Sequence, residues 1–523
     1  MQKKIFFLIF LTILFLNIYS QNNEIIKKQD TNSLIKGIFY PNCVFYEIFV
    51  QSFYDTNNDG IGDIKGVVKK LDYLSNLGIQ AIWLMPINPS PSYHKYDITD
   101  YCNIHPDYGT INDFKTLVKE AHKRDIKIII DLVVNHTSSN HPWFVEASKG
   151  KGNKYHDYYV WSTDKAIFSK EPYHWHFLKD SLGNEIRDEK YYGFFWHGMP
   201  DLNYDNEELR KEIINIGKFW LKDINIDGFR LDAVRFFYPE EEIKKNYRWW
   251  QQFRREMDNV KTNFFMVGEI WGEDTVVAPF LTKGINAGFN FDLSYAIINA
   301  ANKQVDNGLI EKVIKIRSLY KSYEPDFIDA IFLTNHDQDR VMSELQNNID
   351  KAKVAASLLL TLPGSPFIYY GEEIGMRGKK PDELIREPMI WDYDNKEKGQ
   401  TYWEEALYST SRTIVPVSAQ LNDSNSIFNH YKKLIGFRKK SKALTLGDIK
   451  STDLKNINVI SFYREFENES LLVICNLSKK EQIIYLSELA SKYNKLVFST
   501  KGGVEIIDNK IVVPAYANLI FKK

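Results

Sequence analysis

The sequence predicts an α/β fold: a (β/α)8 TIM barrel with an inserted subdomain after strand 3 and a C-terminal all-β sandwich domain. Three observations lead to this prediction. Eight short apolar runs alternate with helical patterns, and parallel strands require such crossovers; eight strands also close this type of barrel. Polar side chains gather at the C-terminal ends of several runs. From about residue 443 the helical patterns stop and only strand-length runs remain.

The predicted strands are short runs of β-branched, aromatic and aliphatic residues. In chain order they are residues 44–53, 81–86, 127–135, 227–234, 264–271, 287–293, 330–337 and 367–375. Helical patterns lie between most of them, for example IKGVVKKLDYLSNLG (64–78) and NEELRKEIINIGKFWLKDI (206–224). This order predicts a barrel in two parts, residues 38–136 and residues 204–442.

Two segments depart from the alternation. Residues 137–203 follow the third strand and are too long for a simple loop, so we expect an inserted subdomain there. Residues 443–523 contain runs such as SLLVICNL (470–477) without intervening helical patterns, and this predicts the C-terminal sandwich.

The N-terminus has the pattern of a secretory signal peptide. Lys3 and Lys4 precede an apolar run at residues 5–18, and a cut after Ser20 is plausible. The run is short for a spanning helix, which needs about 20 apolar residues, although an uncleaved anchor stays open as an alternative. We therefore expect a signal peptide at residues 1–20, a tether at residues 21–37, and a secreted or periplasmic protein.

The composition limits the classes of binding partner that we expect. The formal charge of −1 gives no reason to expect nucleic acid or a membrane surface as a partner. After signal cleavage we expect no stable membrane insertion, and we expect a monomer. Only three cysteines occur, and their odd number and wide spacing predict neither a disulfide framework nor a zinc site.

Charged and amide residues fall toward the C-terminal ends of four predicted strands, where barrel active sites are built. They are Asp131, Asn135 and His136 on strand three, Arg230 and Asp232 on strand four, Glu269 on strand five, and Asn335, His336 and Asp337 on strand seven. A single acid at a strand end is usually a helix cap or a loop salt bridge. Four such clusters at the same end of one barrel instead predict a common site.

Two of these carboxylates fit glycoside chemistry. A retaining glycosidase needs a carboxylate nucleophile and a second carboxyl group, acting first as acid and then as base, about 5–5.5 Å away. Neighbouring strands lie about 4.8 Å apart, so Asp232 and Glu269 form the natural pair. Arg230 points to the same side of its strand as Asp232 and should lower its pKa. Ile270 and Trp271 could supply an apolar wall that raises the pKa of Glu269.

At this point the chain resembles the α-amylase family, glycoside hydrolase family 13. Four motifs match its core motifs in order: DLVVNH (131–136), GFRLDAV (228–234), GEIW (268–271) and FLTNHD (332–337). Three further segments resemble its additional motifs: MPDLN (199–203), GIQAIWLMP (78–86) and GEEIGM (371–376). The resemblance covers about residues 38–523.

The resemblance implies a role for each matching residue. Asp232 would be the nucleophile, Glu269 the general acid/base, and Asp337 a third carboxylate that grips the hydroxyl groups of the sugar. The residues implied to hold the substrate come from several motifs: Tyr96, Asp97, His136, Arg230 and His336.

The resemblance also implies the substrate. MPDLN resembles the group between oligo-1,6-glucosidases and neopullulanases, and SYHKYDITDY (92–101) resembles secreted α-amylases. Ala233 favours α-1,4 bonds, because α-1,6-specific relatives tend to have Val there. We therefore expect a retaining α-amylase acting on starch, glycogen or maltooligosaccharides. An exo-acting α-glucosidase or oligo-1,6-glucosidase, a glucanotransferase, and a non-catalytic sugar-binding or partner protein are the alternatives.

The loop DTNNDGIGD (55–63) has the spacing of a calcium-binding loop. Oxygen ligands would come from the side chains of Asp55, Asn57, Asp59 and Asp63 and from the Ile61 carbonyl. Related amylases carry calcium at this loop, so we expect a structural Ca2+. A second calcium site, between barrel and insert, is less well supported because Phe236 replaces a His common in amylases.

Overall fold

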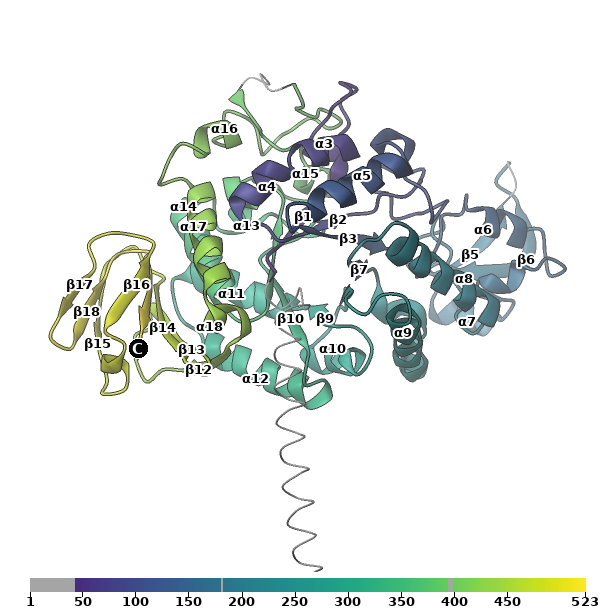
Figure 1. Ribbon diagram of the computed structural model, residues 1–523. Helices are drawn as coiled ribbons and strands as arrows, with labels where there is room; N and C mark the ends of the chain where they lie inside the picture. The colour runs from purple at the N-terminus through teal and green to yellow at the C-terminus, as the bar shows by residue number, and fades with distance from the viewer. Residues whose placement is uncertain (1–42, 180–181, 394–397) are drawn as a thin grey trace, which may run out of the picture. The chain divides into compact units, whose positions relative to one another are not determined.

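The computed structural model describes residues 43–179, 182–393 and 398–523 (Figure 1). The predicted signal peptide and tether lie outside the described residues. Within these ranges, no helix has the length and apolar character needed to cross a membrane.

Eight parallel strands form a closed barrel, as the sequence predicts, in the order β1-β11-β10-β9-β8-β7-β3-β2 (Figure 1). Their bounds are β1 (Phe45–Ile48), β2 (Ala81–Leu84), β3 (Lys127–Leu132), β7 (Gly228–Leu231), β8 (Phe265–Gly268), β9 (Ala287–Phe289), β10 (Ile328–Phe332) and β11 (Ser365–Tyr369). Several strands end earlier than predicted, so the polar residues that follow them lie on loops at the mouth of the barrel.

Helices surround the barrel (Figure 1). The longer ones are α5 (Ile111–His122), α8 (Glu207–Lys218), α9 (Ile243–Asp258), α10 (Asp274–Leu281), α11 (Phe291–Lys303), α12 (Leu309–Tyr323), α14 (Ile349–Thr361) and α17 (Ile427–Lys440). The shorter ones are α2 (Val50–Phe53), α3 (Ile64–Lys69), α4 (Leu71–Leu77), α13 (Val341–Glu344), α15 (Asp382–Ile385), α16 (Val417–Gln420) and α18 (Lys442–Leu446).

Local sequence explains where these helices start and which face they bury. In α5, Thr110 and Asp113 form a reciprocal capping box at the first turn. Phe114, Leu117 and Ala121 then lie on one face at helical spacing, and all three are buried.

Aromatic rings from several strands pack against one another inside the barrel. Phe45 of β1 stacks on Phe367 of β11 with ring centroids 4.3 Å apart, and Phe289 of β9 meets Phe367 at 4.9 Å. This packed layer closes the barrel below its mouth, which leaves the polar residues above it as the available site.

The predicted inserted subdomain follows β3. It contains a three-stranded antiparallel sheet of β4 (Trp161–Ser162), β6 (Glu185–Tyr192) and β5 (Trp175–Lys179), with α6 (Pro142–Ala147) and α7 (Lys165–Lys170). A backbone bridge joins His136 to Asp201, and the Leu202 amide donates to the Asn135 carbonyl at 3.0 Å. The insert is therefore fastened to the end of β3, beside the predicted site.

The C-terminal domain contains two antiparallel sheets, which confirms the all-β prediction (Figure 1). The five-stranded sheet has β12 (Asp448–Ser451), β13 (Val459–Phe466), β14 (Glu469–Asn476), β19 (Asn518–Lys522) and β16 (Lys495–Ser499). The smaller one has β15 (Gln482–Tyr485), β18 (Lys510–Val513) and β17 (Glu505–Ile507). Buried Arg464 of β13 donates to the carbonyl of Thr361 in α14, which joins this domain to the barrel.

Candidate active site

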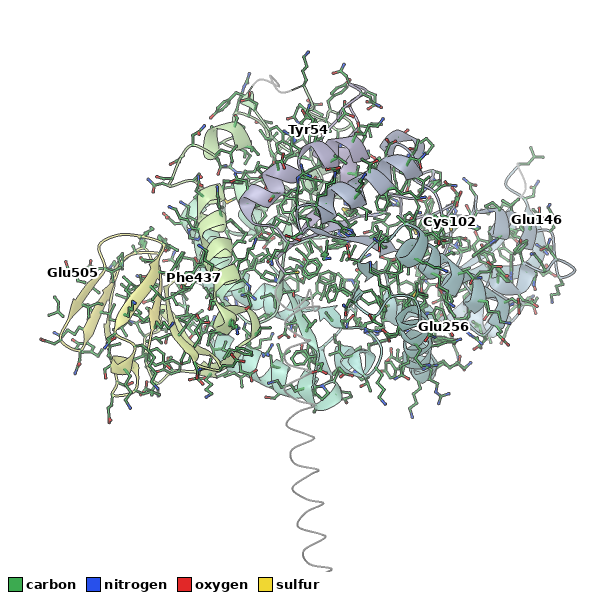
Figure 2. The ribbon with its side chains drawn as sticks, in the orientation of Figure 1. Tyr54, Cys102, Glu146, Glu256, Phe437 and Glu505 are labelled. Atoms are coloured by element: carbon green, nitrogen blue, oxygen red, sulfur yellow. The ribbon has the colours of Figure 1, made fainter. Side chains whose placement is uncertain are left out.

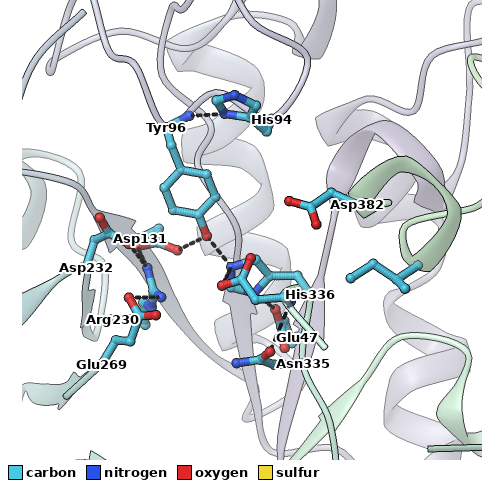
Figure 3. Close-up of polar contacts among 12 residues, drawn as sticks. Glu47, His94, Tyr96, Asp131, Arg230, Asp232, Glu269, Asn335, His336 and Asp382 are labelled. Carbon is cyan, nitrogen blue, oxygen red and sulfur yellow. Dashed lines mark hydrogen bonds and ion pairs between the residues drawn. The ribbon is translucent and has the colours of Figure 1, made fainter. Parts of the chain in front are cut away.

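The predicted charged residues converge at the mouth of the barrel (Figure 3). Asp131 on β3 pairs in register with Arg230 on the neighbouring β7, while Asp232 and Glu269 each lie one residue beyond the end of a strand. At Gly228, where β7 starts, an added Cβ would lie 2.1 Å from the Phe265 carbonyl oxygen. Only glycine therefore lets β7 approach β8 this closely.

Arg230 binds three carboxylates at once. Its Nη1 donates to Asp131 Oδ1 at 2.7 Å and to Asp232 Oδ1 at 2.6 Å. Its Nη2 donates to Glu269 Oε2 at 2.8 Å. The side chain is 1% exposed, so these partners supply the compensation that a buried cation requires. This explains why an arginine lies inside an apolar strand.

Burial and Arg230 act in opposite directions on Asp232. Burial raises the pKa of its carboxyl, Arg230 lowers it, and the nearby Asp131 raises it again, giving about 6. The expected effect of Arg230 is thus present, but it does not bring the pKa below the usual range, because desolvation outweighs it. At neutral pH the group is still mainly a carboxylate.

Glu269 is the second carboxyl group. Burial raises its pKa, although Arg230 lowers it. Trp271 differs from the predicted apolar wall: its Nε1 donates to Glu269 Oε1 at 2.7 Å and lowers the pKa, while its ring stacks on Phe291 at 4.0 Å. The Ala233 amide donates to Glu269 Oε2 at 3.2 Å from a left-handed backbone conformation, φ 50°. The turn after β7 thus aims a donor at β8.

At Asp337 the neighbouring cations outweigh burial, so the pKa is lowered and not raised as it is at Asp232 and Glu269. Burial would raise the pKa of this carboxyl, but His336 and Arg386 hold it well below its usual range. His336 Nε2 lies 3.1 Å from Asp337 Oδ2, and Arg386 Nη2 donates to Asp337 Oδ1 at 3.0 Å. Burial lowers the pKa of His336, yet Asp337 and Glu47 raise it to about 9. A permanently charged pair therefore forms beside the two catalytic candidates.

Tyr96 connects these two charge clusters. Its hydroxyl donates to Asp131 Oδ2 at 3.1 Å and lies 2.6 Å from His336 Nε2 (Figure 3). Its ring stacks on the His336 imidazole with centroids 5.6 Å apart. His136 Nε2 bonds the Tyr96 carbonyl at 3.1 Å, and burial lowers the pKa of His136 to about 4. His136 is therefore a neutral hydrogen-bonding group.

A cleft of about 280 Å³ opens over these residues. Of the predicted substrate-binding residues, Tyr96 and His136 line it, together with all three predicted catalytic carboxylates. Arg230 and His336 are almost fully buried behind the carboxylates. Asp97 is also buried and accepts hydrogen bonds from Ser90 and Ser92, so it orders the loop that carries Tyr96.

The structure adds residues that the sequence did not indicate. Six of them line the cleft or hold its charges: Glu47, His94, Phe195, Trp196, Asp382 and Arg386. Among these six, only Glu47 could have been identified from the sequence. It is a single acid inside the apolar run VFYEIFV, just as Arg230 is a charged residue inside an apolar strand. Figure 3 shows Asp382 across the site from Asp232 and Glu269.

The predicted calcium loop is a compact turn after α2. Asp55 is buried, and its Oδ1 accepts from the amides of Asn57 and Asn58 at 2.9 and 2.6 Å. Asp63 caps α3 by accepting from the Gly66 amide at 2.7 Å. Throughout the described ranges, no group of three or more His, Cys, Asp or Glu side chains is placed to hold a metal.

The candidate ligand atoms of this loop nevertheless have the chemistry that Ca2+ prefers. All five predicted ligands offer oxygen atoms, which hard divalent cations prefer. The side-chain Nδ2 of Asn57 donates to Asp59 Oδ2 at 2.8 Å, and both of these side chains are exposed. These two side chains can rearrange around an ion without disturbing the core.

Comparison with known proteins agrees with this geometry. The family model described as "Alpha amylase, catalytic domain" matches residues 47–447, and "Alpha-amylase SusG C-terminal domain" matches residues 459–520. "Alpha-amylase 3" of Dictyoglomus thermophilum is 44% identical, over 92% of this chain and 94% of that protein. "Oligo-1,6-glucosidase" of Parageobacillus thermoglucosidasius is 32% identical, with 87% and 93% covered.

Solved structures match as well. The crystal structure of an α-amylase from H. orenii superimposes with a TM-score of 0.83 at 42% identity. It covers 92% of this chain and 99% of its own. The barrel, the three carboxylates at its mouth and these matches together show that the chain belongs to the α-amylase family of glycoside hydrolases, glycoside hydrolase family 13.

Proposed function

We propose that this enzyme hydrolyses internal α-1,4-glucosidic bonds of starch, glycogen or maltooligosaccharides with retention of configuration. One observation carries the proposal: Asp232 and Glu269, which directly follow the neighbouring strands β7 and β8, both accept hydrogen bonds from the same Arg230 guanidinium. Because one guanidinium contacts both carboxyl groups, they lie close together, and a retaining enzyme requires a nucleophile and an acid/base that are close together.

Each carboxyl group then has a defined step. Protonated Glu269 donates its proton to the glycosidic oxygen, while ionised Asp232 attacks the anomeric carbon and forms a glucosyl ester. Glu269, now ionised, removes a proton from the incoming water, which releases the sugar from Asp232. Asp337, kept ionised by His336 and Arg386, accepts hydrogen bonds from sugar hydroxyl groups in the distorted transition state.

The proposal also specifies which glycosidic bond is cleaved and whether water or a sugar hydroxyl accepts the glucosyl group. The 44% identical relative is named an α-amylase, whereas a "4-alpha-glucanotransferase" of Thermotoga neapolitana is 35% identical. Ala233 after the nucleophile favours α-1,4 bonds. A sugar hydroxyl can replace water in the second step, so transfer competes with hydrolysis at the same intermediate.

Product analysis tests the proposal. Starch, maltotriose, isomaltose and pullulan are each incubated with the enzyme. We expect mixed short maltooligosaccharides from starch and little action on isomaltose; glucose released one unit at a time would contradict the endo assignment. Asp232→Asn and Glu269→Gln should each lower kcat by orders of magnitude, whereas Asp258→Asn, at the end of α9 and outside the active-site cleft, should not.

The calcium site is proposed on the donor set of the loop. Asp55, Asn57, Asp59, Asp63 and the Ile61 carbonyl would hold a structural Ca2+ that pins the loop after α2. An ion that binds only the folded chain raises the melting temperature Tm. Adding Ca2+ to chelator-treated enzyme should therefore raise Tm, and Asp59→Ala should abolish the increase. No response of the wild type to Ca2+ would contradict the site.

Export is proposed on the N-terminal pattern. Lys3, Lys4 and the apolar residues 5–18 support a signal peptide cut after Ser20, which would make the protein secreted or periplasmic. Mass spectrometry of the enzyme made in its own cells should find a mature chain that starts at Gln21. A full-length chain retained in the membrane would favour the uncleaved anchor.

A further inference from the structure

A second cleft lies between the barrel and the C-terminal domain and shares no lining residue with the active site. Its volume is about 720 Å³, against about 280 Å³ for the active-site cleft. One wall comes from α14 and α17 and the other from the end of β16 and the turn before β19. Phe437 of α17, labelled in Figure 2, packs against Phe498 of β16 at 4.9 Å and marks this boundary.

Three lysines from three separate elements line the cleft: Lys353 of α14, Lys433 of α17 and Lys501 beyond β16. The Nζ atoms of Lys353 and Lys433 donate to the carbonyls of Asn425 and Ser424. Neither of these two lysines forms an ion pair with a carboxylate in the described part of the chain. Lys501 Nζ lies 3.3 Å from a carboxylate oxygen of Asp350, which also lines the cleft.

The charges in the cleft are therefore unbalanced. Burial lowers the pKa of Lys353 and the ammonium group of Lys501 lowers it further, while the carboxylates of Asp350 and Asp423 raise it. His430, beside Lys353, has a pKa of about 3 because of burial and the neighbouring lysines. Lys433 also lowers the pKa of both groups. An anion placed among these ammonium groups would relieve their mutual repulsion.

The remaining lining favours a sugar ring beside the anion. The half-buried rings of Phe498 and Tyr516 line the cleft, and Lys501 Nζ lies 5.5 Å from the Tyr516 ring centroid. The volume is within the range of about 300–1,000 Å³ typical of sites for small organic ligands and is far larger than a bare anion needs.

We propose that this cleft binds a phosphate monoester of a sugar. The phosphate group would lie on the ammonium groups of Lys353, Lys433 and Lys501, and the sugar would contact Phe498 and Tyr516. Because the three lysines come from both domains, the ligand would link the C-terminal domain to the barrel. This site is independent of the proposed amylase activity and needs none of its carboxylates.

Calorimetric titration of the full chain tests the proposal. Glucose 6-phosphate, inorganic phosphate and glucose are titrated separately at an ionic strength fixed with NaCl. Lys433→Gln and Lys501→Gln each remove one ammonium group from the cleft. Lys432→Gln is the matched control. Lys432 directly precedes Lys433 on α17, but its Nζ donates to Asn76 Oδ1 outside the cleft.

We expect saturable binding of glucose 6-phosphate, weakened about tenfold by Lys433→Gln or Lys501→Gln and unchanged by Lys432→Gln. Equal affinity for inorganic phosphate would contradict the proposed sugar contacts and leave a site for the free ion alone. Three outcomes would overturn the proposal: no binding of either phosphate, binding of glucose alone, or equal losses for Lys432→Gln and Lys433→Gln. The last would show only non-specific attraction to a basic surface.

Discussion

Arg230 and Glu269 are joined by a hydrogen bond of 2.8 Å across neighbouring strands, and the same guanidinium also holds Asp232. The nucleophile and the acid/base therefore share one cation. A change in the protonation of either carboxyl group alters the interaction of Arg230 with the other.

Arg230→Lys should keep the charge but lose the forked geometry. A single ammonium cannot present two fixed N–H groups to Asp232 and Glu269, so we expect kcat to fall about 100-fold. Arg230→Met should also destabilise the fold by about 3–5 kcal/mol, because it leaves buried carboxylates without a cation. Steady-state kinetics and thermal unfolding measure the two effects. Near-normal kcat for Arg230→Lys would show that charge alone is sufficient.

Asp131→Asn should move the acid limb of the pH profile. The pKa of Asp232 is about 6, so kcat/KM should fall as the pH drops below about 6 and the nucleophile becomes protonated. The charge of Asp131 raises this pKa. Removing that charge should therefore shift the acid limb to lower pH, whatever the change in maximal rate. A shift to higher pH would contradict this electrostatic description.

Trp271→Phe should move the basic limb. The indole N–H donates to Glu269 and favours its ionised form, so its loss should raise the pKa of Glu269. One hydrogen bond to a charged group corresponds to a shift of about one pH unit. Phenylalanine preserves an aromatic ring against Phe291, which limits structural change. The basic limb of kcat/KM should move to higher pH, and an unchanged limb would count against this contact.

Glu372→Gln should make stability less dependent on pH. Burial raises the pKa of Glu372 to about 8, although the Tyr431 hydroxyl lowers it. The folded chain thus keeps a proton that the unfolded chain loses near pH 4.3. Stability from this group is complete below that pH and is lost as the pH rises toward 8.

The Tm of the wild type should accordingly fall more between about pH 5 and pH 8, which lies inside that range, than the Tm of Glu372→Gln. Glu488→Gln, at an exposed position of the C-terminal domain, serves as the control. Parallel Tm curves for wild type and Glu372→Gln would contradict a protonated buried Glu372.

The barrel and its three carboxylates were predictable from the sequence because their signals are local. Strand runs, turns and a charged residue inside an apolar run can each be recognised within a few positions, as with Arg230 and Asp232. Glu47 carries the same signal in the first strand and was missed. The order of strands then places their ends at one mouth without further information.

Other parts of the site depend on contacts that no local pattern encodes. Arg386 reaches Asp337 from a loop 49 positions further along the chain, and only the assembled barrel brings them together. Considered from the sequence, Arg230 alone predicts a low pKa for Asp232. Its final value depends on how completely the surrounding elements exclude water, and this is a property of the whole fold.

The central claim is that Asp232 forms a covalent bond to the sugar, and one measurement tests it most directly. Glu269→Ala, which cannot deprotonate the incoming water, is treated with an α-maltosyl fluoride that needs no acid to leave, and the digested protein is analysed by mass spectrometry. We predict a maltosyl adduct on the peptide containing residues 228–237, located at Asp232. An adduct at another carboxylate, or products that first appear as the β-anomer, would contradict it.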